Sequence, residues 1–173
     1  LRVIGTDGDD FIEAADGNDT LIGGAGNDDL TGGAGSDEYV FSGRFGSDFV
    51  NDGQDDPAGD IDTLRFADRL PSQVFVTRDL WSVYLVDKLT GDRVAVPGTW
   101  SEGSDAGVAT ASGTWRVAFA DGTVWTSADM LAAADLRRIS NGDDIWFGTD
   151  GDDVADGGQG NDRLFGSTGN DIL

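Results

Sequence analysis

The chain has 173 residues, of which 27 are glycine, 33 acidic and 11 basic, and its formal net charge at pH 7 is −22. This charge excludes nucleic acid as a natural partner, and the lack of cysteine excludes disulfides and thiol nucleophiles. The glycine content favours β structure, in a chain with room for one ordinary domain or two to three small ones. No stretch resembles a signal peptide or a transmembrane segment, and we expect the chain to be a piece of a longer protein, because both ends lie in repeat-like sequence.

Residues 5–40 are four consecutive nine-residue units: GTDGDDFIE, AADGNDTLI, GGAGNDDLT and GGAGSDEYV. The first six residues of each unit are rich in glycine and predict a turn, whereas the last three alternate around one apolar residue and predict a short strand. The sixth position is always aspartate, at Asp10, Asp19, Asp28 and Asp37, and the eighth is apolar, at Ile12, Leu21, Leu30 and Tyr39. A fixed period of this length predicts a solenoid.

Two units would form one coil, so units eighteen residues apart would lie side by side at a strand spacing of about 4.8 Å. Asp10 would then face Asp28, and Asp19 would face Asp37. Carboxylates at that spacing repel by about 3 kcal/mol per pair at an effective dielectric constant of about 20, so a cation is expected between the turns. Calcium fits best, because it accepts many hard oxygens, whereas magnesium demands a strict octahedron and zinc prefers the His or Cys that the chain lacks. The apolar column is sparse, which predicts that calcium switches folding on.

After Val40 the register slips by two residues and resumes as GRFGSDFVN, and a degenerate unit then ends in GDIDTLRF. Asp48 and Asp62 occupy the sixth position of these units and are candidate ligands. The intervening NDGQDDPAGD, with a proline and four acidic residues, is expected to be a loop.

Between residues 66 and 139 a two-residue alternation replaces the nonapeptide pattern. It predicts strands at 81–86, around 94–96 and at 115–119, a turn at 87–92, and a hairpin turn at Asp121-Gly122 that leads into Val124 and Trp125. Residues 98–113 are expected to form a loop of small residues, and Ser127 is expected to cap a short helix over 128–138.

The nonapeptide pattern returns as NGDDIWF, GTDGDDVAD, GGQGNDRLF and GSTGNDIL. The acidic column is restored by Asp144, Asp153, Asp162 and Asp171, and the apolar column by Trp146, Ala155, Leu164 and Leu173. A second solenoid block is therefore predicted.

The units resemble the GGxGxDxUx nonapeptides of the RTX (repeats-in-toxin) family of haemolysin-type calcium-binding repeats, and the third and fourth units match best. The resemblance implies an all-β fold, a right-handed parallel β-roll, with calcium held between turns by sixth-position carboxylates and backbone carbonyls. It implies side-chain ligands at Asp10, Asp19, Asp28 and Asp37, and carbonyl donors at Gly23, Gly24, Ala25, Gly32, Gly33 and Ala34. The first two units depart from the pattern at Thr6, Asp7, Ala14, Ala15 and Asp16, which predicts weaker or incomplete sites there.

Further candidate ligands are the remaining sixth-position aspartates and other turn residues. These are Asp48, Asp62, Asp144, Asp153, Asp162, Asp171, Asp7, Asp9, Asn18, Asn27, Gly5, Gly26, Gly148, Asp150, Asp152, Gly157, Gly158, Gln159 and Asn161. We expect several calcium ions, roughly four to eight.

Three segments are expected: a β-roll block at 1–66, with clean repeats at 5–40 and degenerate ones at 43–66, a β-rich capping domain with a C-terminal helix at 67–138, and a truncated second repeat block at 139–173. The middle segment is similar to the calcium-binding-related domain that often follows RTX repeats, in DTLRFAD, VTRD and FADGTVWTSADM. That similarity implies a cap that closes an open edge of the roll.

The resemblance implies a non-catalytic calcium-binding module of a secreted, extracellular bacterial protein. The module would be disordered without calcium, would fold into a β-roll on binding extracellular calcium, and would support type I secretion and folding of a larger toxin, adhesin or exoenzyme. The expected partners are calcium and, through the parent protein, the type I secretion machinery. The alternative is a module that binds a host receptor, a polysaccharide or a surface, for which the loop around Trp100 is the place to look. Catalysis by the chain itself is not expected, because there is no histidine for a triad, GGAGND lacks the ending of a phosphate-binding loop, and carboxylate pairs occur in any acidic chain.

Overall fold

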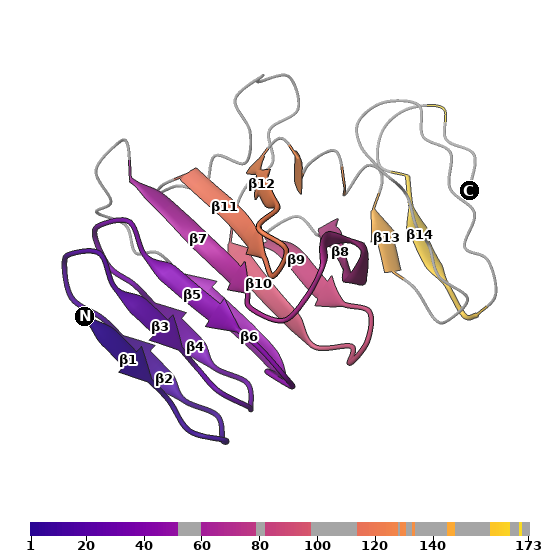
Figure 1. The fold of residues 1–173 in the computed structure, drawn as a ribbon. Coiled ribbons are helices and arrows are strands. Elements are labelled where there is room, and N and C mark those ends of the chain that lie inside the picture. Colours follow the sequence, from indigo (N-terminus) through magenta and orange to yellow (C-terminus); the bar gives the residue numbers. More distant parts are fainter. Residues whose placement is uncertain are drawn as a thin grey trace.

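The computed structural model describes residues 1–51, 60–78, 82–97, 114–127, 129–130, 133, 145–147, 160–166 and 170. Seven short strands at the N-terminal end form a stack of parallel strands (Figure 1). They are β1 (Arg2–Ile4), β2 (Phe11–Glu13), β3 (Thr20–Ile22), β4 (Asp29–Thr31), β5 (Glu38–Phe41), β6 (Ser47–Asn51) and β7 (Ile61–Phe66). We call this part the roll.

Successive strands of the roll alternate between two sheets. Strands β1, β3, β5 and β7 are neighbours in one sheet, and β2, β4 and β6 are neighbours in the other. Phe11 is aligned with Asp29, and Thr20 with Glu38, an offset of eighteen residues in each sheet. The solenoid expected from the nine-residue period, and the all-β parallel roll that the resemblance implies, are confirmed.

The eighth-position side chains fill the space between the two sheets. Leu21, Leu30, Tyr39, Val50 and Leu64 are fully buried. Glycine-rich turns reverse the chain after each strand, so one apolar side chain per unit is enough to build the column. The column thins towards the N-terminus, where Ile12 is 7% exposed and Val3 is half-buried.

A second group of elements continues both sheets beyond the roll. It contains a 3₁₀ turn, η1 (Pro71–Gln73), and the strands β8 (Val74–Arg78), β9 (Ser82–Asp87), β10 (Arg93–Pro97), β11 (Thr114–Phe119) and β12 (Val124–Thr126). Strand β10 pairs in parallel with β6, and β11 in parallel with β7, whereas β8, β9 and β12 are antiparallel additions. We call this group the cap. A single cluster of buried apolar side chains runs through the roll and the cap.

The cap contains the predicted strands and hairpin. Gly122 has a φ of +84°, and Asp121 accepts a hydrogen bond from the Thr123 N–H at 2.9 Å, as a tight hairpin turn requires. Ser127, Asp129, Met130 and Ala133 are helical where the short helix is expected. The predicted cap residue is wrong by one position.

Thr126, not Ser127, caps this helical segment. The Asp129 carboxylate accepts hydrogen bonds from the Thr126 N–H and hydroxyl at 2.8 and 2.7 Å, while the Ser127 hydroxyl donates to the Trp115 carbonyl at 3.2 Å. Ser127 is buried against β11, so its hydroxyl serves the strand backbone instead of the helix end. Trp81, Trp100 and the predicted loops at 52–59 and 98–113 lie outside the described residues.

The second repeat block contributes a separate two-stranded parallel sheet, β13 (Ile145–Phe147) with β14 (Arg163–Phe165). Trp146 is aligned with Leu164, again an offset of eighteen residues, and both side chains are half-buried. Within the described part of the chain, no helix is long and apolar enough to cross a membrane.

The apolar column yields a stability prediction. Replacing Leu30 by Ala should lower the free energy of unfolding in calcium by about 2–5 kcal/mol, because it opens a cavity between the sheets. Phe11→Ala, on the adjacent strand β2, is the control, and its change should stay within about 0.5 kcal/mol because Phe11 is 71% exposed. Urea denaturation in saturating calcium measures both, and equal losses would contradict the proposed core.

Candidate metal centre

The turns of the roll stack along two edges. The first edge carries the turns at residues 5–10, 23–28 and 42–46, and the second carries those at 14–19 and 32–37 (Figure 1). Stacking brings the turns so close that side chains are excluded. A Cβ on Gly24 would overlap the Thr6 carbonyl of the preceding turn, and one on Gly46 would overlap the Gly26 carbonyl.

Sixth-position aspartates form a ladder along each edge. On the first edge the Asp10 N–H donates to Asp28 Oδ1 at 2.9 Å, and the Asp28 N–H donates to Asp48 Oδ1 at 3.0 Å. The second edge repeats the pattern, from Asp19 to Asp37 at 2.7 Å and from Asp37 to Asp62 at 2.8 Å. The ladder places one oxygen of Asp28, Asp37, Asp48 and Asp62 against the preceding turn on the same edge.

These carboxylates lie inside the protein. Asp28, Asp37, Asp48 and Asp62 are each at most 3% exposed, and Asp19 is 5% exposed. Burial raises the pKa of Asp28, an effect that the Asp10 N–H partly offsets and the charges of Asp10 and Asp9 increase. Burial also raises the pKa of Asp48 to about 7, with further contributions from the Asp28 and Asp92 carboxylates. Two neighbouring buried acids with raised pKa values, Asp28 and Asp48, make the first edge a place that favours a cation.

The oxygens between the first two turns of the first edge suit calcium. Asp28 Oδ2 is buried and has no hydrogen-bond partner, and a Cβ on Gly23 would overlap it. The Gly23 carbonyl lies beside Gly5, and the Thr6 carbonyl lies beside Gly24, so backbone oxygens of both turns approach the same gap. Carboxylate and carbonyl oxygens without nitrogen or sulfur are the donors that calcium prefers. Nowhere among the described residues do three acidic side chains converge on one point, so any site here would draw mainly on backbone carbonyls.

The first turn of the first edge differs from the second at Thr6, where the repeat pattern has glycine. The Thr6 N–H and hydroxyl donate to Asp10 Oδ2 at 2.6 and 2.9 Å, whereas the equivalent oxygen of the second turn, Asp28 Oδ2, has no hydrogen-bond partner. Threonine in place of glycine therefore adds a hydroxyl donor to the carboxylate. The weaker site expected in the first unit stays a prediction.

Fifth-position side chains form a second ladder that the sequence reasoning missed. Asp9 Oδ1 accepts the Asn27 N–H at 2.8 Å, Asn18 Oδ1 accepts the Ser36 N–H at 3.1 Å, and Asn27 Oδ1 accepts the Ser47 N–H at 3.1 Å. The structure thus places the candidate ligands Asp9, Asn18 and Asn27 on inter-turn hydrogen bonds at the surface. The signal was present in the sequence, because Asp, Asn or Ser recurs at the fifth position of every clean unit.

Tyr39 brings an unforeseen hydroxyl to the second edge. Its ring fills the eighth position, and its hydroxyl accepts the Gly32 N–H at 2.9 Å. A Cβ on Gly32 would overlap both Asp37 Oδ2 and this hydroxyl, so the two oxygens lie next to one another. Sequence reasoning treated Tyr39 as a core residue alone, since nothing in the pattern shows that its hydroxyl reaches back to the turn.

Other predicted ligands divide into those placed in turns and those outside the described residues. Gly33 lies beside the Ala15 carbonyl, the Ala34 carbonyl accepts the Gly17 N–H at 2.6 Å, and Asp7 is exposed. Ala25 is half-buried in the second turn, and Asn161 and Asp162 precede β14. The predicted residues that lie outside the described part of the chain are Asp144, Gly148, Asp150, Asp152, Asp153, Gly157, Gly158, Gln159 and Asp171.

Residues 4–39 and 139–173 match the RTX calcium-binding nonapeptide repeat, in four copies. No curated protein sequence matches the chain. Eight chains of solved structures match it. One is the extracellular lipase LipA from Serratia marcescens, at 17% sequence identity and a TM-score of 0.24, with 98% of this chain and 28% of the lipase chain covered. The present chain therefore corresponds to about a quarter of that protein's length.

The aspartate ladder predicts the effect of a charge deletion. Asp28→Asn keeps an oxygen for the Asp10 N–H but removes the charge beside Gly23, so the calcium midpoint should rise by about tenfold or more. Asp29→Asn is the matched control, because Asp29 is the next residue and lies outside the ladder on β4. Calcium titrations of both variants followed by tryptophan fluorescence would refute the assignment if the midpoints shifted equally.

The raised pKa of Asp48 predicts a pH dependence. Below about pH 7 calcium must displace a proton from this carboxyl, so calcium affinity should be about tenfold weaker at pH 6 than at pH 8. Without calcium, the stability of the fold depends on pH in the opposite direction to calcium affinity. The raised pKa of Asp48 favours the folded state at low pH, and this contribution to the free energy of unfolding is lost as the pH rises from about 4 to about 7. Isothermal titration at the two pH values measures the first effect, and Asp48→Asn should flatten it.

Proposed function

Because the chain carries RTX calcium-binding nonapeptide repeats at residues 4–39 and 139–173, we propose that calcium bound between successive turns drives the roll to fold. The observation that carries the proposal is the buried aspartate column, in which Asp28 Oδ2 has no hydrogen-bond partner and its carboxyl has a raised pKa. A buried acid in this state weakens the folded form, and a divalent cation reverses the effect. The chain would act as a calcium-responsive folding module, not as an enzyme.

The ligands proposed for each site come from two neighbouring turns. The sixth-position aspartate of the later turn supplies the charge, and backbone carbonyls such as those of Thr6 and Gly23 supply further oxygens. A site made in this way exists only when the turns are stacked, so calcium binds the folded form and not the unfolded one. With free calcium at ten times the dissociation constant, each site contributes about 1.4 kcal/mol, and the contributions add along the roll.

The parent protein is proposed to be secreted by a bacterium through a type I channel, with this chain unfolded during export and folded outside the cell. The proposal is supported by the RTX repeats, by the absence of cysteine and by a net charge of −22, which opposes collapse of the chain where calcium is scarce. The parent is proposed to be a larger toxin, adhesin or exoenzyme.

Calcium removal tests the folding switch. In excess chelator the circular dichroism spectrum should show a marked loss of β structure, and a few millimolar calcium should restore it, whereas the same concentration of magnesium should not. An identical spectrum in chelator and in calcium would refute the proposal. Asp28→Asn provides the internal check, because its transition should require more calcium than that of the unchanged chain.

A further inference from the structure

The aspartate ladder of the first edge stops where the cap begins. Strand β10 lies against β6 in parallel, as the next strand of the roll would, and the Arg93 N–H donates to the Gly46 carbonyl at 2.8 Å. In this register Val94 is aligned with Asp48, so an apolar residue stands where the next sixth-position aspartate is expected. The cap therefore imitates a further coil of the roll without supplying its carboxylate.

A buried arginine occupies the junction instead. Arg69 follows β7, and its side chain is 9% exposed. Its guanidinium donates to the Gly43 carbonyl at 2.6 Å and to Asp87 Oδ2 at 2.7 Å, and it forms an ion pair with Asp68 at 2.8 Å. The positive group thus lies between a carbonyl oxygen of a roll turn and a carboxylate of the cap. Carbonyl and carboxylate oxygens are also the groups that face each other between the turns proposed to bind calcium.

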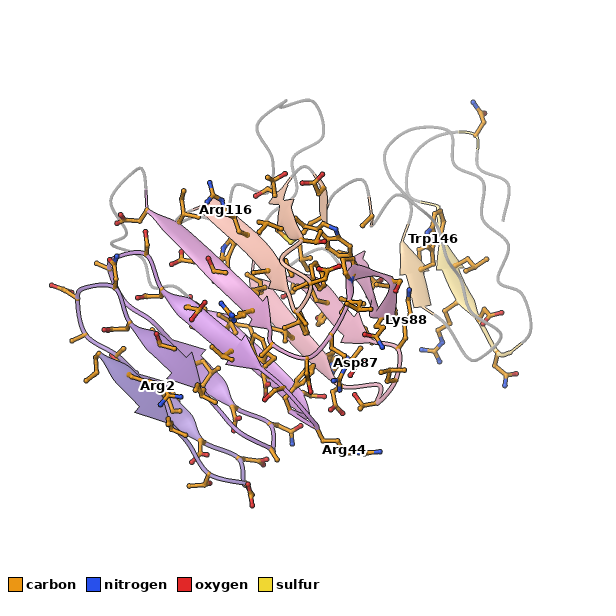
Figure 2. The ribbon with its side chains drawn as sticks, in the orientation of Figure 1. Arg2, Arg44, Asp87, Lys88, Arg116 and Trp146 are labelled. Carbon is orange, nitrogen blue, oxygen red and sulfur yellow. The ribbon has the colours of Figure 1, made fainter. Side chains whose placement is uncertain are left out.

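The surroundings of Asp87 stabilise its carboxylate in the charged form, which pairs with a cation. It is fully buried at the end of β9, and it also accepts hydrogen bonds from the Leu89 N–H and the Thr90 hydroxyl, both at 2.8 Å. Burial alone would raise its pKa, but these donors and Arg69 together hold the pKa below its usual value. Figure 2 shows Asp87 on the same side of the molecule as Arg44, which lies in the turn between β5 and β6.

Two further carboxylates accept hydrogen bonds from the same roll turn, at residues 42–46. The Gly43 N–H donates to Asp68 Oδ2 at 2.9 Å, and the Phe45 N–H donates to Asp92 Oδ2 at 3.0 Å. The junction therefore gathers the carboxylates of Asp68, Asp87 and Asp92 around one roll turn, with Arg69 as the cation that touches two of them. Such an arrangement would be strongly repulsive without its positive group.

We propose that the Arg69 guanidinium takes the place of a calcium ion at the last inter-turn position of the first edge, so that the cap joins the roll without metal. Guanidinium and calcium share a preference for carbonyl and carboxylate oxygens, but the guanidinium is covalently attached and is always present. The junction would persist where calcium is scarce, while the turns at 5–10 and 23–28 would not. The comparison with calcium rests on the proposed function, whereas the metal-free junction does not.

Hydrogen exchange and calcium counting test this proposal on the whole chain. In chelator, the amides of Phe45 and Arg93 should exchange at least about tenfold more slowly than those of Asp10 and Asp28, because the first pair is held by the cap. Arg69→Ala should abolish this difference in chelator. In millimolar calcium the same variant should recover the protection and bind one more calcium ion than the unchanged chain, since the oxygens of Gly43, Asp68 and Asp87 remain.

Two variants serve as controls. Arg65→Ala removes an exposed arginine that pairs with Glu38, and it should change neither the protection nor the ion count. The double variant Arg69→Met with Asp87→Asn removes both charges and should gain no calcium ion. Unprotected Phe45 and Arg93 amides in the unchanged chain in chelator would overturn the proposal. So would an Arg69→Ala variant that gains no ion or does not recover in calcium. If instead the unchanged chain binds no calcium, the proposed function fails, and protection in chelator still decides whether the junction is metal-free.

Discussion

Burying a carboxylate in each successive turn from Asp19 to Asp62 is the constraint on which the rest of the structure depends. The sheets fix the spacing of the turns, so Asp10, Asp28 and Asp48 follow one another at eighteen to twenty residues, and Asp28 and Asp48 each accept a hydrogen bond from the backbone of the turn before. Neutral hydrogen bonds from the backbone do not cancel the charge, which is why burial and neighbouring acids raise the pKa of Asp28 and Asp48. The proposed calcium ions would offset this charge, and the fold would then depend on a cation in a way that an apolar core does not.

The two ends of the roll differ in how the edges of the sheets are covered. At the N-terminal end Ile4 and Phe11 are largely exposed and the eighth-position column thins out. At the other end β10 and β11 extend the two sheets in parallel, and each then pairs with an antiparallel strand, β9 or β12. Phe66 and Phe119 stack with ring centroids 6.0 Å apart across this junction, so ordinary hydrophobic packing supports the cap where the roll depends on its charged turns.

Much of this arrangement could be predicted from the sequence, because a nine-residue period leaves few choices for the placement of Asp28, Leu30 and their equivalents. The period fixed which residues share a column, and the alternation in 81–86 and 115–119 located the strands of the cap. What the period could not show were contacts made by side chains outside its columns. Thr6 on Asp10, the Tyr39 hydroxyl beside Asp37 and Arg69 in the junction depend on how the chain returns in space, and a linear pattern carries no such information.

The two ladders also restrict how such a roll can change in length. Sixth-position backbone groups donate to the following turn on the same edge, and fifth-position side chains accept from it, so every turn is matched to partners two units away. Adding a single unit would move each later strand into the opposite sheet and each later turn to the opposite edge. The two extra residues after Val40 are tolerated because they are absorbed between β5 and β6, where Asp29 still aligns with Phe49. Related rolls are thus expected to gain or lose nine-residue units in pairs during evolution, while small insertions are expected in the turns.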